Sequence, residues 1–197
     1  MEEQRKQIKA AWDMARFNDL ENLQKIVSKS SSIDPNARIY EDGIDPQTLL
    51  QIASFSNAVS CIEYLISQGA NVEQRNFNGY TALHFAAYTG SVEAIQVLAS
   101  NFANVECRTI DGKTPLHIAS ARGHYAAAKQ LITCKAKVNA CDCEGATPLF
   151  HAIIGNHQNV AKLLLENKAD PYHMNADKAT ASLIAAQYGR TWFSPEM

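Results

Sequence analysis

A step of 33 residues organises this chain and limits it to folds built from similar, stacked units. Threonine recurs at this step, without insertion or deletion, at Thr48, Thr81, Thr114, Thr147 and Thr180. An alanine follows each threonine by five residues, and a leucine follows the first four by two residues. A fixed period of roughly 20–50 residues is typical of repeat proteins, in which each unit buries its apolar face against its neighbours. The sequence therefore predicts a solenoid of one repeated motif.

Each unit is predicted to contain two short helices. The threonine hydroxyl can accept a hydrogen bond from the free amides of a helix that begins one residue later. Pro115 and Pro148 stand at that next position, where a missing amide has no intrahelical partner. The first helix should end at residues that tolerate left-handed backbone, which are Gly90, Gly123, Gly189, Asn57 and Asn156. Apolar stripes such as Val160, Leu163 and Leu164 predict the second helix.

Polar stretches with turn chemistry connect consecutive units. Gly79, Gly112 and Gly145 lie in them, as in RNFNGY and RTIDGK, and predict hairpin-like loops. The small alanine side chains of the first helices allow the units to approach at the separation of packed helices, about 8–10 Å.

The segments TALHFAAYTG, TPLHIASARG and TPLFHAIIGN resemble the hallmark T-P-L-H-x-A-A-x-x-G of the ankyrin repeat family. The resemblance implies an all-α ankyrin-repeat solenoid of helix-turn-helix units with hairpin-like loops, with about five full repeats and an incomplete C-terminal unit. It implies a single domain over 1–197. Its expected units are an N-terminal cap at 4–36, full repeats at 43–75, 76–108, 109–141 and 142–174, and a partial C-terminal cap at 175–197. The segment SSIDPNARIYEDGIDP is expected to be a long linking loop.

One departure from the family pattern affects stability, and one retained residue concerns modification. The family usually has glycine at the end of the second helix; Gly69 keeps it, whereas Phe102, Lys135 and Lys168 replace it. If these three residues adopt left-handed backbone, each should cost on the order of 1 kcal/mol relative to glycine. Asn139 retains an asparagine that hydroxylases modify in some ankyrin proteins, although a structural role is the expected one.

Composition favours a soluble protein of a reducing compartment. The 18 basic and 20 acidic residues give a net charge of −2, so no overall charge draws the chain to nucleic acid or to an anionic membrane. The apolar runs are shorter than a membrane helix, and five cysteines without framework spacing are expected to be free thiols. We expect a cytoplasmic protein, with the nucleus as the alternative.

Catalytic, cofactor and metal sites are not expected. His84 and His117 occupy the fourth hallmark position, where the resemblance implies a structural hydrogen bond between loops. Cys107, Cys141, Cys143 and His173 form the nearest approach to a ligand cluster, and the repeat separation is expected to hold them too far apart for zinc. The chain also lacks phosphate-loop, nucleophile-elbow and zinc-protease motifs. It is therefore predicted not to be an enzyme.

The resemblance implies a scaffold or adaptor that binds a protein through loop tips and the concave face. By register, the candidate partner-binding residues are Phe55, Arg75, Phe77, Asn78, Tyr80, Tyr88, Arg108, Ile110, Asp111, Lys113, Arg122, Glu144 and Ile154. The alternative for Phe77 and Ile110 is that they pack on neighbouring loops. The rival functions are a structural subunit of a larger assembly and a regulatory or inhibitory domain of an enzyme complex.

The oligomeric state and the C-terminal edge leave alternatives open. We expect a monomer, with self-association through the C-terminal edge as the alternative. Trp192 and Phe193 are expected to cover apolar surface that the missing second helix leaves on the last full repeat, and they could instead form a partner site.

Overall fold

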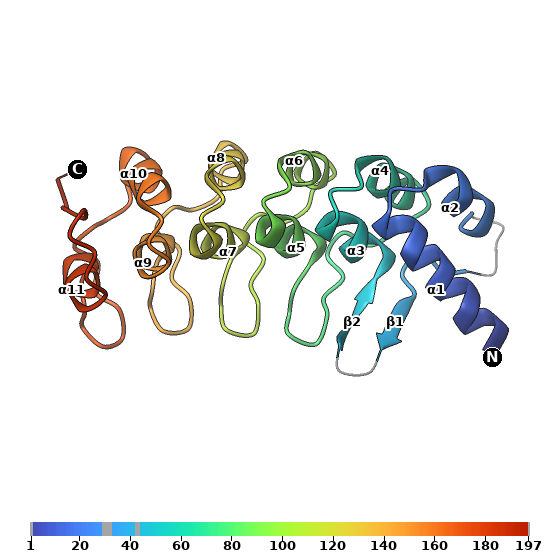
Figure 1. Ribbon diagram of the computed structural model, residues 1–197, viewed down its shortest axis with the longest axis horizontal. Helices are drawn as coiled ribbons and strands as arrows, with labels where there is room; N and C mark the ends of the chain where they lie inside the picture. Colours follow the sequence, from blue (N-terminus) through green and yellow to red (C-terminus); the bar gives the residue numbers. More distant parts are fainter. Residues whose placement is uncertain (1, 29–32, 42–43, 197) are drawn as a thin grey trace. The chain divides into compact units, whose positions relative to one another are not determined.

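The computed structural model describes residues 2–28, 33–41 and 44–196, and Figure 1 shows its helical hairpins. The chain separates into two compact units, Met1–Asn104 and Val105–Met197. In each unit, short helices stack in two layers, as the repeat predicted. No helix in the described part of the chain is long and apolar enough to cross a lipid bilayer. The single domain expected from the sequence stays a prediction.

The N-terminal unit stacks three helix pairs and one hairpin. Its elements are α1 (Glu2–Arg16), α2 (Leu20–Ile26), β1 (Arg38–Glu41), β2 (Ile44–Thr48), α3 (Leu49–Phe55), α4 (Val59–Ser67), α5 (Ala82–Thr89) and α6 (Val92–Ser100). The inner helix α3 packs between α1 and α5, and the outer helix α4 packs between α2 and α6. The predicted capping pair is present as α1 and α2, with left-handed backbone at Asn18 (φ 56°) where they turn. Residues 29–32 of the predicted cap lie outside the described residues.

The long linking loop expected before α3 contains two paired strands. Strands β1 and β2 pair antiparallel across this segment, with Arg38 opposite Thr48 and Ile39 opposite Gln47. Backbone pairing satisfies peptide groups that an extended loop would leave to water, and it leads the chain directly into the Thr48 cap of α3. This segment therefore forms a hairpin, like the loops of the later units. Residues 42–43 lie outside the described part of the chain.

The C-terminal unit repeats the same arrangement. Its elements are α7 (Pro115–Arg122), α8 (Tyr125–Thr133), α9 (Pro148–Ile154), α10 (Gln158–Glu166) and α11 (Ala181–Gln187). Inner helix α9 packs between α7 and α11, and outer helix α8 packs on α10. The described residues after α11, up to residue 196, form no further helix. The partial C-terminal cap stays a prediction.

The predicted helix boundaries are confirmed. Each threonine of the repeated column directly precedes an inner helix. The first helices end in left-handed backbone at Gly90 and Gly123, with φ of 77° and 75°. Phe102, Lys135 and Lys168 also have left-handed backbone, with φ of 64°, 70° and 67°, which confirms the geometry predicted for the lost glycines.

Candidate functional site

The loop tip before α5 holds an exposed aromatic ring in a fixed position. Phe77 is 67% exposed, while its backbone amide and that of Asn78 donate to the carboxylate of Asp45 at 3.0 and 3.1 Å. The side-chain amide of Asn78 donates to the same carboxylate at 2.9 Å. The guanidinium of Arg38 lies 5.9 Å from the centre of the Phe77 ring, and Arg75 beside the tip is exposed. The neighbouring hairpin thus fixes this tip and leaves most of the ring in solvent.

Four aromatic rings of the N-terminal unit form a continuous row, here called the aromatic ladder: Tyr80, Phe85, Phe55 and Tyr88. Tyr80 at the loop base contacts Phe85, which is buried and supports Phe55. Phe55 and Tyr88 stack at 24° near the ends of α3 and α5 and are 37% and 36% exposed. Aromatic side chains exposed in a group are common anchors of protein interfaces.

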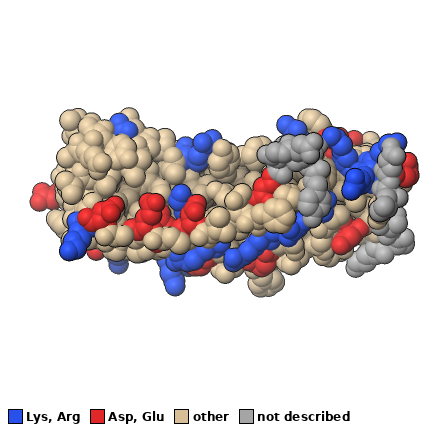
Figure 2. All heavy atoms as spheres, turned by 90° about the horizontal axis from the view of Figure 1, so that it is seen from below, with Lys and Arg blue, Asp and Glu red and all other residues tan. Residues whose placement is uncertain are grey.

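The loop tips of the C-terminal unit are also exposed, and several of their polar groups are already bonded. Ile110 is 66% exposed at its tip, beside Asp111 and Lys113, whose charged atoms lie 3.9 Å apart. Arg108 donates from Nη1 to the carbonyl oxygens of Gly112 at 2.8 Å and Cys141 at 2.6 Å, so it braces two neighbouring loops. Figure 2, which views the molecule from below the loops of Figure 1, shows acidic and basic side chains on this side.

The candidate partner-binding residues divide by exposure. The exposed ones are Phe55, Arg75, Phe77, Asn78, Tyr88, Arg108, Ile110, Asp111, Arg122 and Glu144. The half-buried ones are Tyr80, Lys113 and Ile154. Their assignment to a partner stays a prediction, and the structure assigns Arg108 and Asn78 internal contacts as well.

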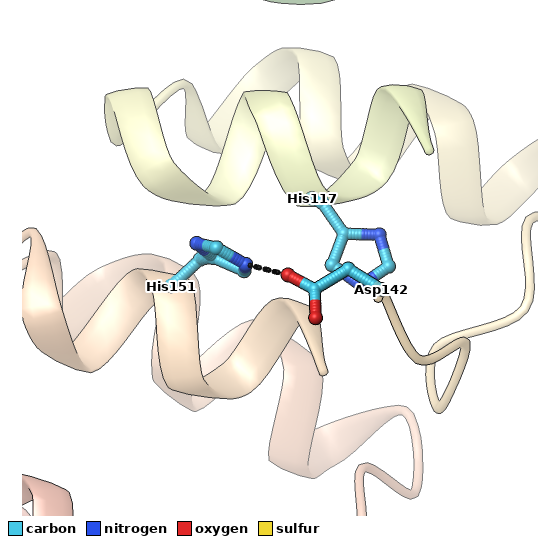
Figure 3. A group of neighbouring side chains, drawn as sticks. All are labelled: His117, Asp142 and His151. Atoms are coloured by element: carbon cyan, nitrogen blue, oxygen red, sulfur yellow. Dashed lines mark hydrogen bonds and ion pairs between the residues drawn. The ribbon is translucent and has the colours of Figure 1, made fainter. Parts of the chain in front are cut away.

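A buried polar network joins α7, the following loop and α9. Figure 3 shows the side chains of His117, Asp142 and His151 converging from these three segments. His151 Nε2 lies 2.8 Å from Asp142 Oδ2, and Asp142 Oδ1 accepts the backbone amides of Glu144 at 3.0 Å and Ala146 at 2.9 Å. Burial alone would raise the pKa of Asp142, but the hydrogen bonds from His151 and Ala146 outweigh it and lower that pKa. The carboxylate therefore stays ionised inside the repeat stack.

These three side chains could surround a metal ion, since one potential ligand atom from each lies within 4.8 Å of the others. Both nitrogens of His117 are already engaged, however. Nδ1 accepts the Thr114 amide at 3.1 Å, which leaves the proton on Nε2 to be donated to the Ala146 carbonyl oxygen at 3.1 Å. Binding a metal at Nε2 would break the hydrogen bond that links α7 to the following loop. The arrangement fits a structural network better, and the structural role expected for His117 is confirmed.

The expectation that the repeat separation keeps Cys141 and His173 a full repeat apart is wrong. Cys141 Sγ lies 3.5 Å from His173 Nε2, because the hairpin loops carry their side chains toward the neighbouring unit. His173 Nε2 also lies 3.0 Å from the Gly145 carbonyl oxygen, to which it donates. This contact joins two loops, and the described residues place no third cysteine, histidine or acidic ligand with the pair.

Asn139 has the structural role expected of it. Its side chain donates to the Lys168 carbonyl oxygen at 2.9 Å and accepts the Asp170 amide at 2.8 Å. Glu73 and Glu106, at the equivalent positions, accept the amides of Asn104 and Lys137. Hydroxylation of Asn139 stays the untested alternative.

The sequence carried a signal for the buried network that its analysis missed. The hallmark histidine is replaced by Phe150 in the unit TPLFHAIIGN, and a histidine follows one position later as His151. As a result, Thr147 Oγ is buried with no hydrogen-bond partner, whereas Thr114 Oγ lies 2.8 Å from His117 Nδ1. A displaced histidine nine residues after a loop aspartate is the pattern that could have indicated the pair.

The C-terminal tail contacts the end of α9. Arg190 donates to the carbonyl oxygens of Ile153 and Ile154, and Trp192 Nε1 donates to Asn156 Oδ1 at 2.8 Å. Trp192 and Phe193 are half-buried and meet edge to face. The covering of apolar surface by Trp192 and Phe193 stays a prediction.

Comparison with known families supports the repeat reading directly. A family model described as "Ankyrin repeats (3 copies)" matches residues 11–109 and 102–175, well over half of the chain. No curated protein sequence matches the chain significantly. With its capped helical hairpins, left-handed helix ends and stacked loops, the chain belongs to the ankyrin repeat family.

Proposed function

We propose that this chain is a protein-binding scaffold or adaptor that engages its partner through its loop tips and inner helices. Ankyrin repeats are generally protein–protein interaction modules and are typically non-enzymatic. The proposal rests chiefly on the exposed aromatic surface of the N-terminal unit, where Phe77, Phe55 and Tyr88 are 67%, 37% and 36% exposed. Fixed, exposed aromatic rings lose little conformational freedom on binding and therefore serve as anchors.

The C-terminal unit contributes a second, more polar set of candidates. Ile110 offers an apolar tip, and Asp111, Arg122 and Glu144 are exposed charges beside the loops and the inner helices. Such charges act chiefly on association rate and partner choice. We also propose a cytoplasmic or nuclear location, because all five cysteines are free thiols, which suit a reducing compartment.

A quantitative capture experiment tests the proposed function. The full chain is immobilised as wild type, Phe77→Ala, Tyr88→Ala and Phe102→Ala, and bound proteins are compared by mass spectrometry. Phe102 is the matched control, because it is 92% exposed but lies at the end of an outer helix. The proposal predicts proteins that are retained by wild type and Phe102→Ala and lost from the other two variants. Equal retention by all four would contradict it.

A further inference from the structure

The aromatic ladder has a regular spacing. Ring centres are 5.6 Å apart for Tyr80–Phe85, 6.4 Å for Phe85–Phe55 and 6.3 Å for Phe55–Tyr88. In an extended chain, alternate side chains point to one side and are about 6.4–6.8 Å apart. Because Phe85 is buried, apolar side chains at alternate positions of an extended segment would meet the exposed rings of Phe55 and Tyr88, whose centres are 6.3 Å apart.

The ladder is confined to the N-terminal unit. One repeat after Tyr80, Phe85 and Tyr88, the chain has Lys113, Ile118 and Ala121, so the C-terminal unit has no equivalent row of rings. Binding by stacking on rings should therefore depend on residues of the N-terminal unit.

A positive charge lies at the loop end of the ladder. Gln51 Nε2 donates to the carbonyl oxygens of both Gln74 and Tyr80, so the backbone at Arg75, the residue after Gln74, lies close to the backbone of Tyr80. The Arg75 guanidinium is exposed, and among the described side chains no carboxylate forms an ion pair with it. Arg38 brings a second guanidinium to the Arg75 backbone, where it donates to the Arg75 carbonyl oxygen at 2.7 Å.

Three carboxylates of this unit already accept hydrogen bonds from other groups of the chain. Asp45 accepts the amides of the loop tip, Glu73 accepts the Asn104 amide at 2.7 Å, and Glu93 accepts from the Asn57 side chain at 2.9 Å. The loop end of the ladder therefore offers positive charge that an acidic group of a partner can complement.

We propose that the aromatic ladder and Arg75 bind an extended segment of the partner protein that has apolar residues at alternate positions and an acidic residue at the end beside Arg75. This inference rests on the proposed function and specifies the partner's chemistry. The rings bind the apolar side chains, and Arg75 sets the direction of the segment by pairing with its carboxylate.

Selection from a phage-displayed library of random 12-residue peptides tests the inference. The full chain is the bait, and binders that also bind the Tyr88→Ala variant are removed. The expected peptides share apolar residues at alternate positions next to Asp or Glu. In fluorescence anisotropy, Phe55→Ala and Arg75→Glu should each weaken a selected peptide about tenfold or more, because they remove a ring anchor and reverse the pairing charge. Phe102→Ala and Lys129→Glu, both at exposed sites on outer helices, should leave its binding unchanged.

Two further variants separate binding from folding. Tyr88→Phe keeps the ring and should keep the affinity. A peptide whose acidic residue is replaced by Lys should bind Arg75→Glu more tightly than wild type. Basic peptides, an apolar pattern with helical spacing, or a failure to recover any ladder-dependent peptide would overturn the inference. In those cases a protein whose capture still depends on Phe77 would leave the proposed function standing.

Discussion

His151 Nε2 lies 2.8 Å from Oδ2 of Asp142, a residue that is only 8% exposed. One repeat later, the equivalent positions hold Ile184 and Asn175, which need no ion pair. In this unit, His151 therefore supplies the partner that allows the charged Asp142 to be buried in the stack.

Removing one partner of this pair should lower the stability of the protein more than removing both. We predict that His151→Ile lowers the free energy of unfolding by about 1–3 kcal/mol, because a buried carboxylate loses its side-chain partner. Adding Asp142→Asn, which copies the pattern of the later unit, should recover most of that loss. Urea unfolding of wild type, both single variants and the double variant measures this. Equal stability of His151→Ile and the double variant would contradict the prediction.

Mild acid should destabilise the repeat stack through His117. Burial, followed by the neighbouring His151, lowers the pKa of His117 from 6.5 to about 4, so the folded protein holds this ring neutral. The stabilisation is fully present above pH 6.5, the value for the unfolded chain, and is lost as the pH falls toward the folded value of about 4. Between pH 7.5 and pH 5, titration of His117 should lower the free energy of unfolding by about 2 kcal/mol.

The control for this pH dependence is His117→Gln. Gln51 occupies the equivalent position in an earlier unit and makes the corresponding bonds to the cap and to the next loop. A glutamine at 117 should therefore fold without titrating. Chemical denaturation at the two pH values should show a smaller decrease in the free energy of unfolding for this variant than for wild type. Equal decreases would rule out His117 as the source of the pH dependence.

Restoring glycine at the left-handed helix ends that have lost it should stabilise the protein. Lys135→Gly and Lys168→Gly remove side chains from residues with φ of 70° and 67°, and each should raise the free energy of unfolding by up to about 1 kcal/mol. Lys137→Gly is the matched control, because this exposed lysine does not have left-handed backbone and glycine there adds only flexibility to the unfolded chain. Thermal melts should show higher midpoints for the first two variants and a lower one for the control. An unchanged or lower midpoint for Lys135→Gly would count against this account.

Two threonines in the same column should respond differently to loss of the hydroxyl. Thr114→Val should cost about 1 kcal/mol, because Oγ interacts with His117 Nδ1. Thr147→Val should be neutral or slightly stabilising, since its buried hydroxyl has no partner and Phe150 replaces the histidine. Denaturation midpoints of the two variants provide the comparison, and a larger loss for Thr147→Val would show that its hydroxyl is satisfied in solution.

Features that depend on single positions in the repeat could be predicted from the sequence. A threonine cap, a glycine or asparagine with left-handed backbone, and a leucine facing the core each follow from local backbone chemistry repeated at a fixed step. The repeat alignment likewise predicted left-handed backbone for Phe102 and Lys135 at the ends of their helices.

Features that join loops of neighbouring units could not be predicted in this way. The hairpin before α3, the contact of Cys141 with His173 and the pair of Asp142 with His151 depend on how far each loop folds back over its neighbour. The helix register fixes where a loop begins and ends, but not which side chains its tip brings together. The exposure of the aromatic ladder likewise depends on the stacking of α3 and α5.

The affinity of the captured partner for matched aromatic variants measures whether these rings form the binding surface. Isothermal titration calorimetry of wild type, Phe77→Ala, Tyr88→Ala and Phe102→Ala, each checked by thermal melt, measures it. The account predicts that Phe77→Ala and Tyr88→Ala each lose about 2 kcal/mol or more of binding free energy. Phe102→Ala should bind like wild type, and all variants should stay folded. Unchanged affinity for both ring variants, or losses that only follow a loss of folding, would contradict the claim that these rings form the binding surface.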